Sequence, residues 1–133
     1  MATKQDYDKV RELTAQLDTW KQVIRDQMNN PEALTKAGMN IALLNSDISV
    51  YVAIFHETAS NEKIETYLEE RANKATQGDS EIIARKAELE PRKFYELTKA
   101  VVKSNEALMA RLRDRLDFLK EENRNQTIKL GGY

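Results

Sequence analysis

Residues 31–55 read PEALTKAGMNIALLNSDISVYVAIF, and this stretch decides the fold. Its apolar residues recur in alternating steps of three and four, the spacing that places side chains along one face of an α-helix. The stripe consists of Leu34, Ala37, Ile41, Leu44, Ile48, Tyr51 and Phe55. The end of the stretch, VYVAIF, also has strand propensity, but the regular spacing that leads into it favours a helix.

The remaining sides of this predicted helix are also mostly apolar. The only charged residues of the stretch are Glu32, Lys36 and Asp47. The apolar residues that lie off the stripe are Met39, Ala42, Leu43, Val50, Val52, Ala53 and Ile54. A helix that is apolar on every side must be covered on every side. We therefore expect a macromolecular partner, and a second copy of the same chain is the simplest one.

The predicted oligomer interface combines this helix with one polar residue near the C-terminus. Asn105 falls within an apolar seam, where a polar side chain often fixes the register or the oligomeric state. The predicted interface residues are Ile41, Leu44, Ile48, Tyr51, Val52, Phe55 and Asn105.

The whole chain of 133 residues is predicted to be one all-α domain, residues 1–125, followed by a flexible or docking tail at residues 126–133. We predict helices at about residues 4–28, 31–76 and 80–123, with a kink or break near Pro91. Whether residues 31–76 form one helix or two stays open. The last two segments are expected to pack as an antiparallel, coiled-coil-like hairpin within an oligomeric helical bundle.

Three local signals support these boundaries. Asn30 is suited to cap the second helix, and Pro31 to occupy its first turn. Gly78 is suited to the left-handed residue that follows a helix end, with Asp79 or Ser80 capping the next helix. Gly38, inside the second helix, indicates either tolerated strain or a close crossing with another helix.

The residues that catalysis usually recruits are scarce in this chain. It contains no cysteine and one histidine, His56, and its four glycines form no phosphate-binding loop. We therefore expect a non-enzymatic protein with no metal, no cofactor and no small-molecule substrate. The N-terminal residues resemble no signal peptide, and we identify no uninterrupted apolar run of the roughly 18 residues that a membrane span needs. These features predict a cytoplasmic protein without a membrane partner.

Charge is distributed unevenly along the chain. Residues 1–80 carry 9 basic and 13 acidic residues, a net of −4, whereas residues 81–133 carry 12 and 9, a net of +3. The basic half could face an anionic polymer or could be an ordinary solvated helix surface. On the first interpretation, single-stranded nucleic acid binds to cations of the last helix, beside aromatic rings on which bases stack. The candidate cations are Lys99, Lys103, Arg111, Arg113, Arg115, Lys120 and Arg124.

The order of segments also resembles a known type of protein. A short helix pair, a polar arm and a turn at Gly78 precede the segment ARKAEL at residues 84–89. A long terminal helix follows, with Leu108, Leu112, Leu116, Phe118 and Leu119. Over residues 40–123 this layout is similar to the UvsY-type recombination mediators of phages.

That resemblance implies a helical oligomer that binds single-stranded DNA and assists recombination or replication in the cytoplasm of a host cell. The alternative is a helical adaptor, chaperone or phage anti-defence inhibitor that acts on a host protein. In that case residues 41–55 or the tail would make the contact.

Overall fold

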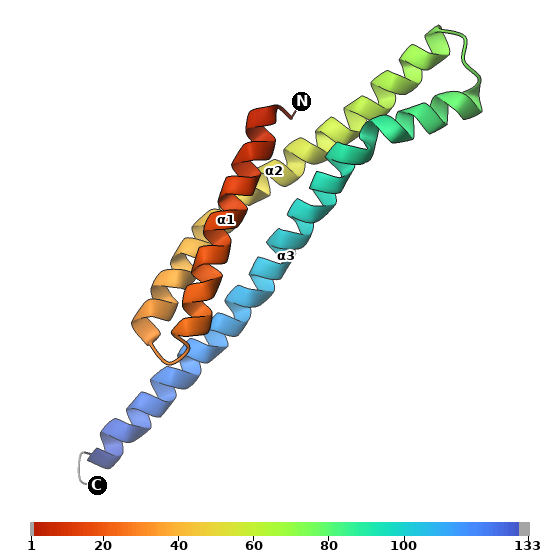
Figure 1. Ribbon diagram of the computed structural model, residues 1–133. Coiled ribbons are helices and arrows are strands. Elements are labelled where there is room, and N and C mark those ends of the chain that lie inside the picture. Colours follow the sequence, from red (N-terminus) through yellow and green to blue (C-terminus); the bar gives the residue numbers. More distant parts are fainter. Residues whose placement is uncertain (1, 131–133) are drawn as a thin grey trace.

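The computed structural model describes residues 2–130 and consists of three α-helices (Figure 1). They are α1 (Lys4–Asp26), α2 (Pro31–Ala72) and α3 (Gln77–Leu130). α2 and α3 run antiparallel and side by side, and α1 packs along the first half of α2. With 54 residues at 1.5 Å each, α3 is about 80 Å long. The molecule is therefore a narrow rod, and the predicted all-α hairpin architecture is confirmed.

The predicted start of α2 is confirmed, whereas the predicted end of α3 is wrong. Asn30 caps α2, because its Oδ1 accepts the Ala33 amide at 3.2 Å and Pro31 occupies the first turn. α2 is also a single helix, ending at Ala72. α3, however, does not end near residue 123 but continues to Leu130. The expected tail therefore begins inside a helix, because residues 121–130 contain no helix-breaking glycine or proline. Residues 131–133 lie outside the described part of the chain.

The turn between α2 and α3 also differs from the prediction. Lys74, not Gly78, adopts the left-handed conformation, with φ of 66°. The Ala75 amide donates to the Glu70 carbonyl at 3.0 Å and the Lys74 amide to the Arg71 carbonyl at 3.1 Å. These two bonds are those of a Schellman motif, which closes the helix end whichever residue stands at its left-handed position. Gly78 lies instead in the first turn of α3.

Thr76 caps the start of α3, since its Oγ1 accepts the Asp79 amide at 3.1 Å. Pro91 lies inside this helix and does not divide it. Figure 1 shows α3 changing direction between residues 80 and 100. Proline has no amide to continue the helical hydrogen bonds and its ring crowds the preceding turn, which accounts for a bend in this region.

The core lies along the facing stripes of the three helices. The α2 stripe predicted from sequence is buried from Leu34 to Phe55, except that Tyr51 is only partly buried. α1 contributes Val10, Leu13, Leu17 and Ile24, and α3 contributes Thr98, Asn105, Leu112 and Leu119.

At Gly38 a side chain of α3 packs directly against the backbone of α2. A Cβ atom built on Gly38 would lie 2.8 Å from Cδ2 of Leu112, a buried residue of α3. Real Cβ atoms essentially never come that close to another heavy atom. The missing side chain therefore provides the space for the tip of the Leu112 side chain, as expected for a glycine at a contact between helices.

A polar layer interrupts the apolar seam between α2 and α3. Asn105 is fully buried, and its Nδ2 donates a hydrogen bond of 2.9 Å to Oδ1 of Asn45. Oδ1 of Asn105 is buried and has no hydrogen-bond partner among the described residues. A buried amide left unpaired is costly. A shift of α3 along α2 would separate the two side chains, so the pair favours one register of the hairpin.

An aromatic cluster joins the three helices at the N-terminal end of α1. The Tyr7 ring lies 4.9 Å from Phe55 and packs edge-on against Phe94 at 4.6 Å, between ring centroids. Burial raises the pKa of the Tyr7 phenol, and the nearby carboxylates of Glu90 and Glu62 raise it further. This cluster anchors the start of α1, where the apolar stripe of α1 begins.

Enlarging residue 38 tests the close approach of α2 and α3. We expect Gly38→Val to lower the free energy of unfolding by about 1–3 kcal/mol, because the added Cβ would overlap the buried Leu112 side chain. Gly78→Ala is the matched control. A Cβ at that position meets nothing within 4 Å, so stability should stay the same or rise by up to about 1 kcal/mol. Equal effects of both substitutions in urea denaturation would contradict the packing described here.

Candidate binding surfaces

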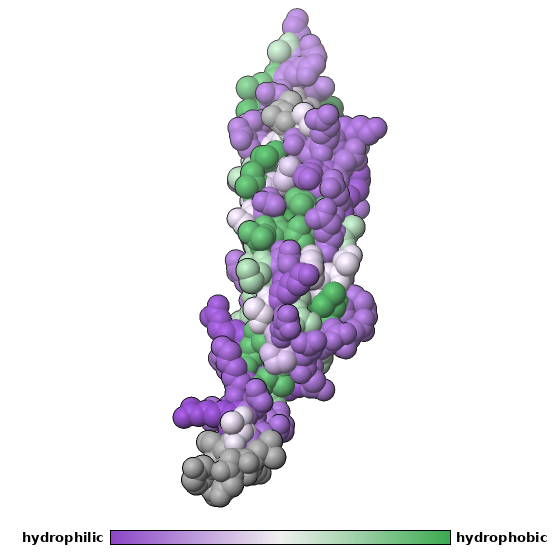
Figure 2. All heavy atoms as spheres, turned by 90° about the vertical axis from the view of Figure 1, so that its left-hand side faces the viewer, coloured by the Kyte–Doolittle hydropathy of each residue, from purple (hydrophilic) through white to green (hydrophobic). Residues whose placement is uncertain are grey.

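The side of α2 that faces away from α1 and α3 carries large apolar residues in solvent. Met39, Leu43 and Val50 are 64%, 66% and 60% exposed. Together with the exposed residues Ser46 and Ala53 they form a second line with steps of four and three, which we call the outer face of α2. Figure 2 shows apolar side chains scattered along the length of one side of the rod, with hydrophilic ones between them.

The residues predicted to form the oligomer interface lie elsewhere. Ile41, Leu44, Ile48 and Phe55 are buried inside the chain, Tyr51 and Val52 are partly buried, and Asn105 pairs with Asn45 of the same chain. Burial within one chain contradicts the intermolecular assignment of the buried residues, whereas for Tyr51 and Val52 the assignment stays a prediction. The spacing identifies a stripe that must be covered, but α3 of the same chain is long enough to cover it. The apolar excess predicted for the other sides of α2 is confirmed, and it is there that large apolar residues are exposed.

α2 has one further property that a count of uninterrupted apolar residues does not identify. By length and composition alone, a stretch of α2 is apolar enough to cross a membrane. A count of uninterrupted apolar runs does not detect it, because isolated polar residues divide those runs. In the structure one side of this helix is occupied by α1 and α3, and Asn45 and Thr58 are among its buried residues.

The cations predicted to contact nucleic acid lie on α3, and all but one are exposed. The exposed ones are Lys99, Lys103, Arg111, Arg113, Lys120 and Arg124. They do not form one uniform strip, because Arg111 and Arg113 are about 200° apart around the helix. Exposed acids, including Glu106, Asp114 and Asp117, lie among them. The local positive field of a single copy is therefore modest.

Arg115 has a different environment from the other cations. Its Nε donates to the Met28 carbonyl at 3.1 Å and its Nη2 to Oδ1 of Asn29 at 2.5 Å. Both acceptors belong to the turn between α1 and α2, so Arg115 ties this turn to α3. Its guanidinium also lies 5.2 Å from the ring centroid of Phe118, which is 55% exposed.

A second aromatic ring with cations near it lies on the hairpin. The guanidinium of Arg92 and the ammonium of Lys99 each lie 5.6 Å from the Tyr95 ring centroid, and the His56 ring lies 4.8 Å from it. The sequence did not predict the contact between His56 and Tyr95, because the two residues are distant along the chain. The steps of three and four that separate Tyr95 from Arg92 and Lys99 were a usable signal.

One acidic residue near this cluster, Glu88, forms ion pairs across the hairpin and within α3. Glu88 of α3 forms ion pairs with Lys63 of α2 at 3.7 Å and with Arg92 at 3.0 Å.

Within residues 2–130, no three side chains of the types that ligate metals converge on one point. Comparison with protein-family models, with curated proteins and with solved structures finds no match for this chain.

Proposed function

We propose that this protein is a non-catalytic helical module that works by binding other protein chains, copies of itself included, along the outer face of α2. One observation carries the proposal: Met39, Leu43 and Val50 are large, apolar and about two-thirds exposed on a regularly spaced line. Exposed apolar patches with a polar rim are typical of interaction sites. Residues at steps of three and four are the form in which one helix presents itself to another.

The energetics of this face favour a helical partner over a small contact. Fully burying a side chain such as Leu43 contributes roughly 1.5–3 kcal/mol, whereas association costs several kcal/mol in lost freedom of motion. A contact with a single residue is therefore insufficient. A partner helix that lies along the outer face covers Met39, Leu43 and Val50 at once and offsets that cost.

A second candidate function is binding of single-stranded nucleic acid by α3, as the resemblance to recombination mediators suggests. The supporting observation is the pairing of rings with cations, Arg115 with the exposed Phe118 and Lys99 with Tyr95. Bases stack on such rings while cations hold the phosphates. Because a single copy has a modest positive field, assembly through α2 would raise the affinity by presenting several α3 helices together.

A charge placed on the outer face tests the first proposal. We expect Leu43→Glu to lower the average mass of the assembly, measured by light scattering in the micromolar range, because burying a carboxylate in an apolar interface is unfavourable. Helicity and thermal stability should be preserved, since Leu43 is exposed within one chain. Ile82→Glu, at an exposed apolar residue of α3, is the matched control and should leave the mass unchanged. Identical masses for the wild type and Leu43→Glu would refute self-association through this face.

The nucleic-acid proposal has an independent test. We expect fluorescent single-stranded DNA to bind in low salt, with an affinity that falls steeply as salt is added, because phosphate contacts release counterions. Replacing Arg113, Lys120 and Arg124 by alanine should reduce the salt dependence by about 0.7 logarithmic units for each phosphate that is no longer neutralised. Arg25→Ala, at an exposed cation of α1, should have no effect. Absence of binding in low salt would exclude this function.

A further inference from the structure

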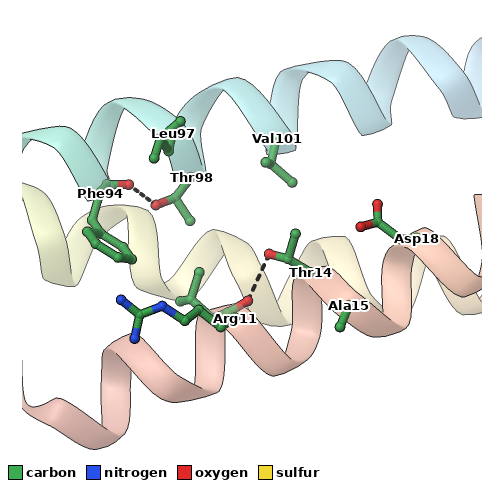
Figure 3. Close-up of a pocket in the computed structure, with 9 residues that line it drawn as sticks. Arg11, Thr14, Ala15, Asp18, Phe94, Leu97, Thr98 and Val101 are labelled. Carbon is green, nitrogen blue, oxygen red and sulfur yellow. Dashed lines mark hydrogen bonds between the residues drawn. The ribbon is translucent and has the colours of Figure 1, made fainter.

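A groove with mostly apolar walls runs between α1 and α3 on the side of the rod away from the outer face of α2. Figure 3 shows α1 and α3 as its two walls with α2 behind them. Its volume is about 440 Å³, and its apolar and small lining residues are Val10, Thr14, Ala15, Phe94, Leu97 and Val101. α1 and α3 are each packed chiefly against α2, which leaves the space between them unfilled.

The shape of the groove suits a helix from another chain. Thr14 and Ala15 are small and lie at the middle of the α1 wall, so they permit a close approach. Leu97, on the opposite wall, is 53% exposed. Three helices with an open groove between the outer two are one element short of a four-helix arrangement.

Charges at the two ends of the α1 wall indicate which chain fits. Arg11 and Asp18 both line the groove, seven residues apart and thus about 10 Å along the helix. The midpoint between them falls at Thr14 and Ala15. The Arg11 side chain is 62% exposed, with its guanidinium 5.3 Å from the Phe94 ring centroid. Asp18 is exposed and forms no ion pair with the residues that the structure describes.

Opposite charges at equal distances from a midpoint make a surface complementary to itself. A second copy related by a two-fold axis through Thr14 and Ala15 runs antiparallel to the first. Arg11 of each copy then meets Asp18 of the other, and each Leu97 is covered by the facing chain. Contacts of this kind occur in pairs in every two-fold dimer.

We propose that the groove between α1 and α3 is a two-fold interface with a second copy of this chain, held in register by reciprocal Arg11–Asp18 pairs. This interface is separate from the outer face of α2 and does not rest on the function proposed for that face. If both faces are used, copies join alternately through the groove and through α2.

Charge reversal tests the pairing, using the dissociation constant of the dimer from analytical ultracentrifugation in low salt. Measurements are made in the Leu43→Glu background, so that the outer face of α2 does not contribute. Arg11→Glu places two pairs of like negative charges in the interface, and Asp18→Arg places two pairs of like positive ones. We expect each to weaken the dimer at least about tenfold, because like charges replace attractive pairs. The double reversal should restore the wild-type value.

Mixing the two single variants supplies a result that only the two-fold arrangement predicts. Each variant alone should be mostly monomeric, whereas the mixture should form a heterodimer, since every facing pair is then of opposite charge. Arg11 also forms an ion pair with Asp8 of the same helix at 3.3 Å, which the Arg11→Glu substitution removes. Circular dichroism therefore checks that each variant keeps its helicity.

Three results would overturn the proposal. The first is a Leu43→Glu chain that is monomeric in the micromolar range before Arg11 or Asp18 is changed. The second is a dimer that is insensitive to either reversal. The third is a mixture of the single variants that stays monomeric. Each can occur whether or not Leu43→Glu itself lowers the mass of the wild-type assembly, so failure here is distinguishable from failure of the α2 proposal.

Discussion

The close contact of α2 with α3 is the constraint on which the rest of the structure depends. Gly38 lacks the Cβ that would lie 2.8 Å from Cδ2 of Leu112, so the Leu112 side chain packs directly against the backbone of α2. Seven residues further along α2, the buried Asn45 accepts a hydrogen bond from the Asn105 side chain. This bond opposes any shift of α3 along α2. With distance and register set by these two contacts, the direction of every other side of α2 and α3 follows.

The main consequence is that α2 has more apolar surface than its own chain covers. α3 and α1 bury one stripe of α2, from Leu34 to Ala59, and within residues 2–130 no helix covers the opposite side. A compact globule would fold such a surface inward, but long helices joined by short turns cannot. The outer face of α2 and the groove between α1 and α3 both result from this geometry, and both are suited to contacts between chains.

Much of the fold could be predicted from sequence because its determinants are local. Steps of three and four identified the helices and their buried stripes, the caps at Asn30 and Pro31 fixed the start of α2, and a glycine inside a helix indicated a contact between helices. The turn was predicted wrongly, because a Schellman motif at Lys74 replaced the glycine signal at Gly78. The interface residues were misplaced for a different reason. Periodicity shows that a stripe must be buried but does not show whether the same chain or another chain buries it.

The candidate binding surfaces could be predicted only in part. The apolar excess of α2 and the cations of α3 are visible in the sequence. The role of Arg115 is not, since its partners at Met28 and Asn29 are distant along the chain and become neighbours only when α3 folds back over the turn. The groove is likewise invisible in sequence, because its walls belong to α1 and α3, and their separation depends on how each packs on α2.

Amide hydrogen exchange at two protein concentrations, above and below the point at which the assembly dissociates, tests the central claim most directly. The claim is that the α2–α3 hairpin is held by contacts within one chain and that association uses only the faces left over. It predicts that the slowest-exchanging amides lie in residues 34–59 of α2 and 98–119 of α3, and that their protection is unchanged by dilution. Loss of this protection together with dissociation would show that the core of the hairpin is built between chains, and would contradict the account.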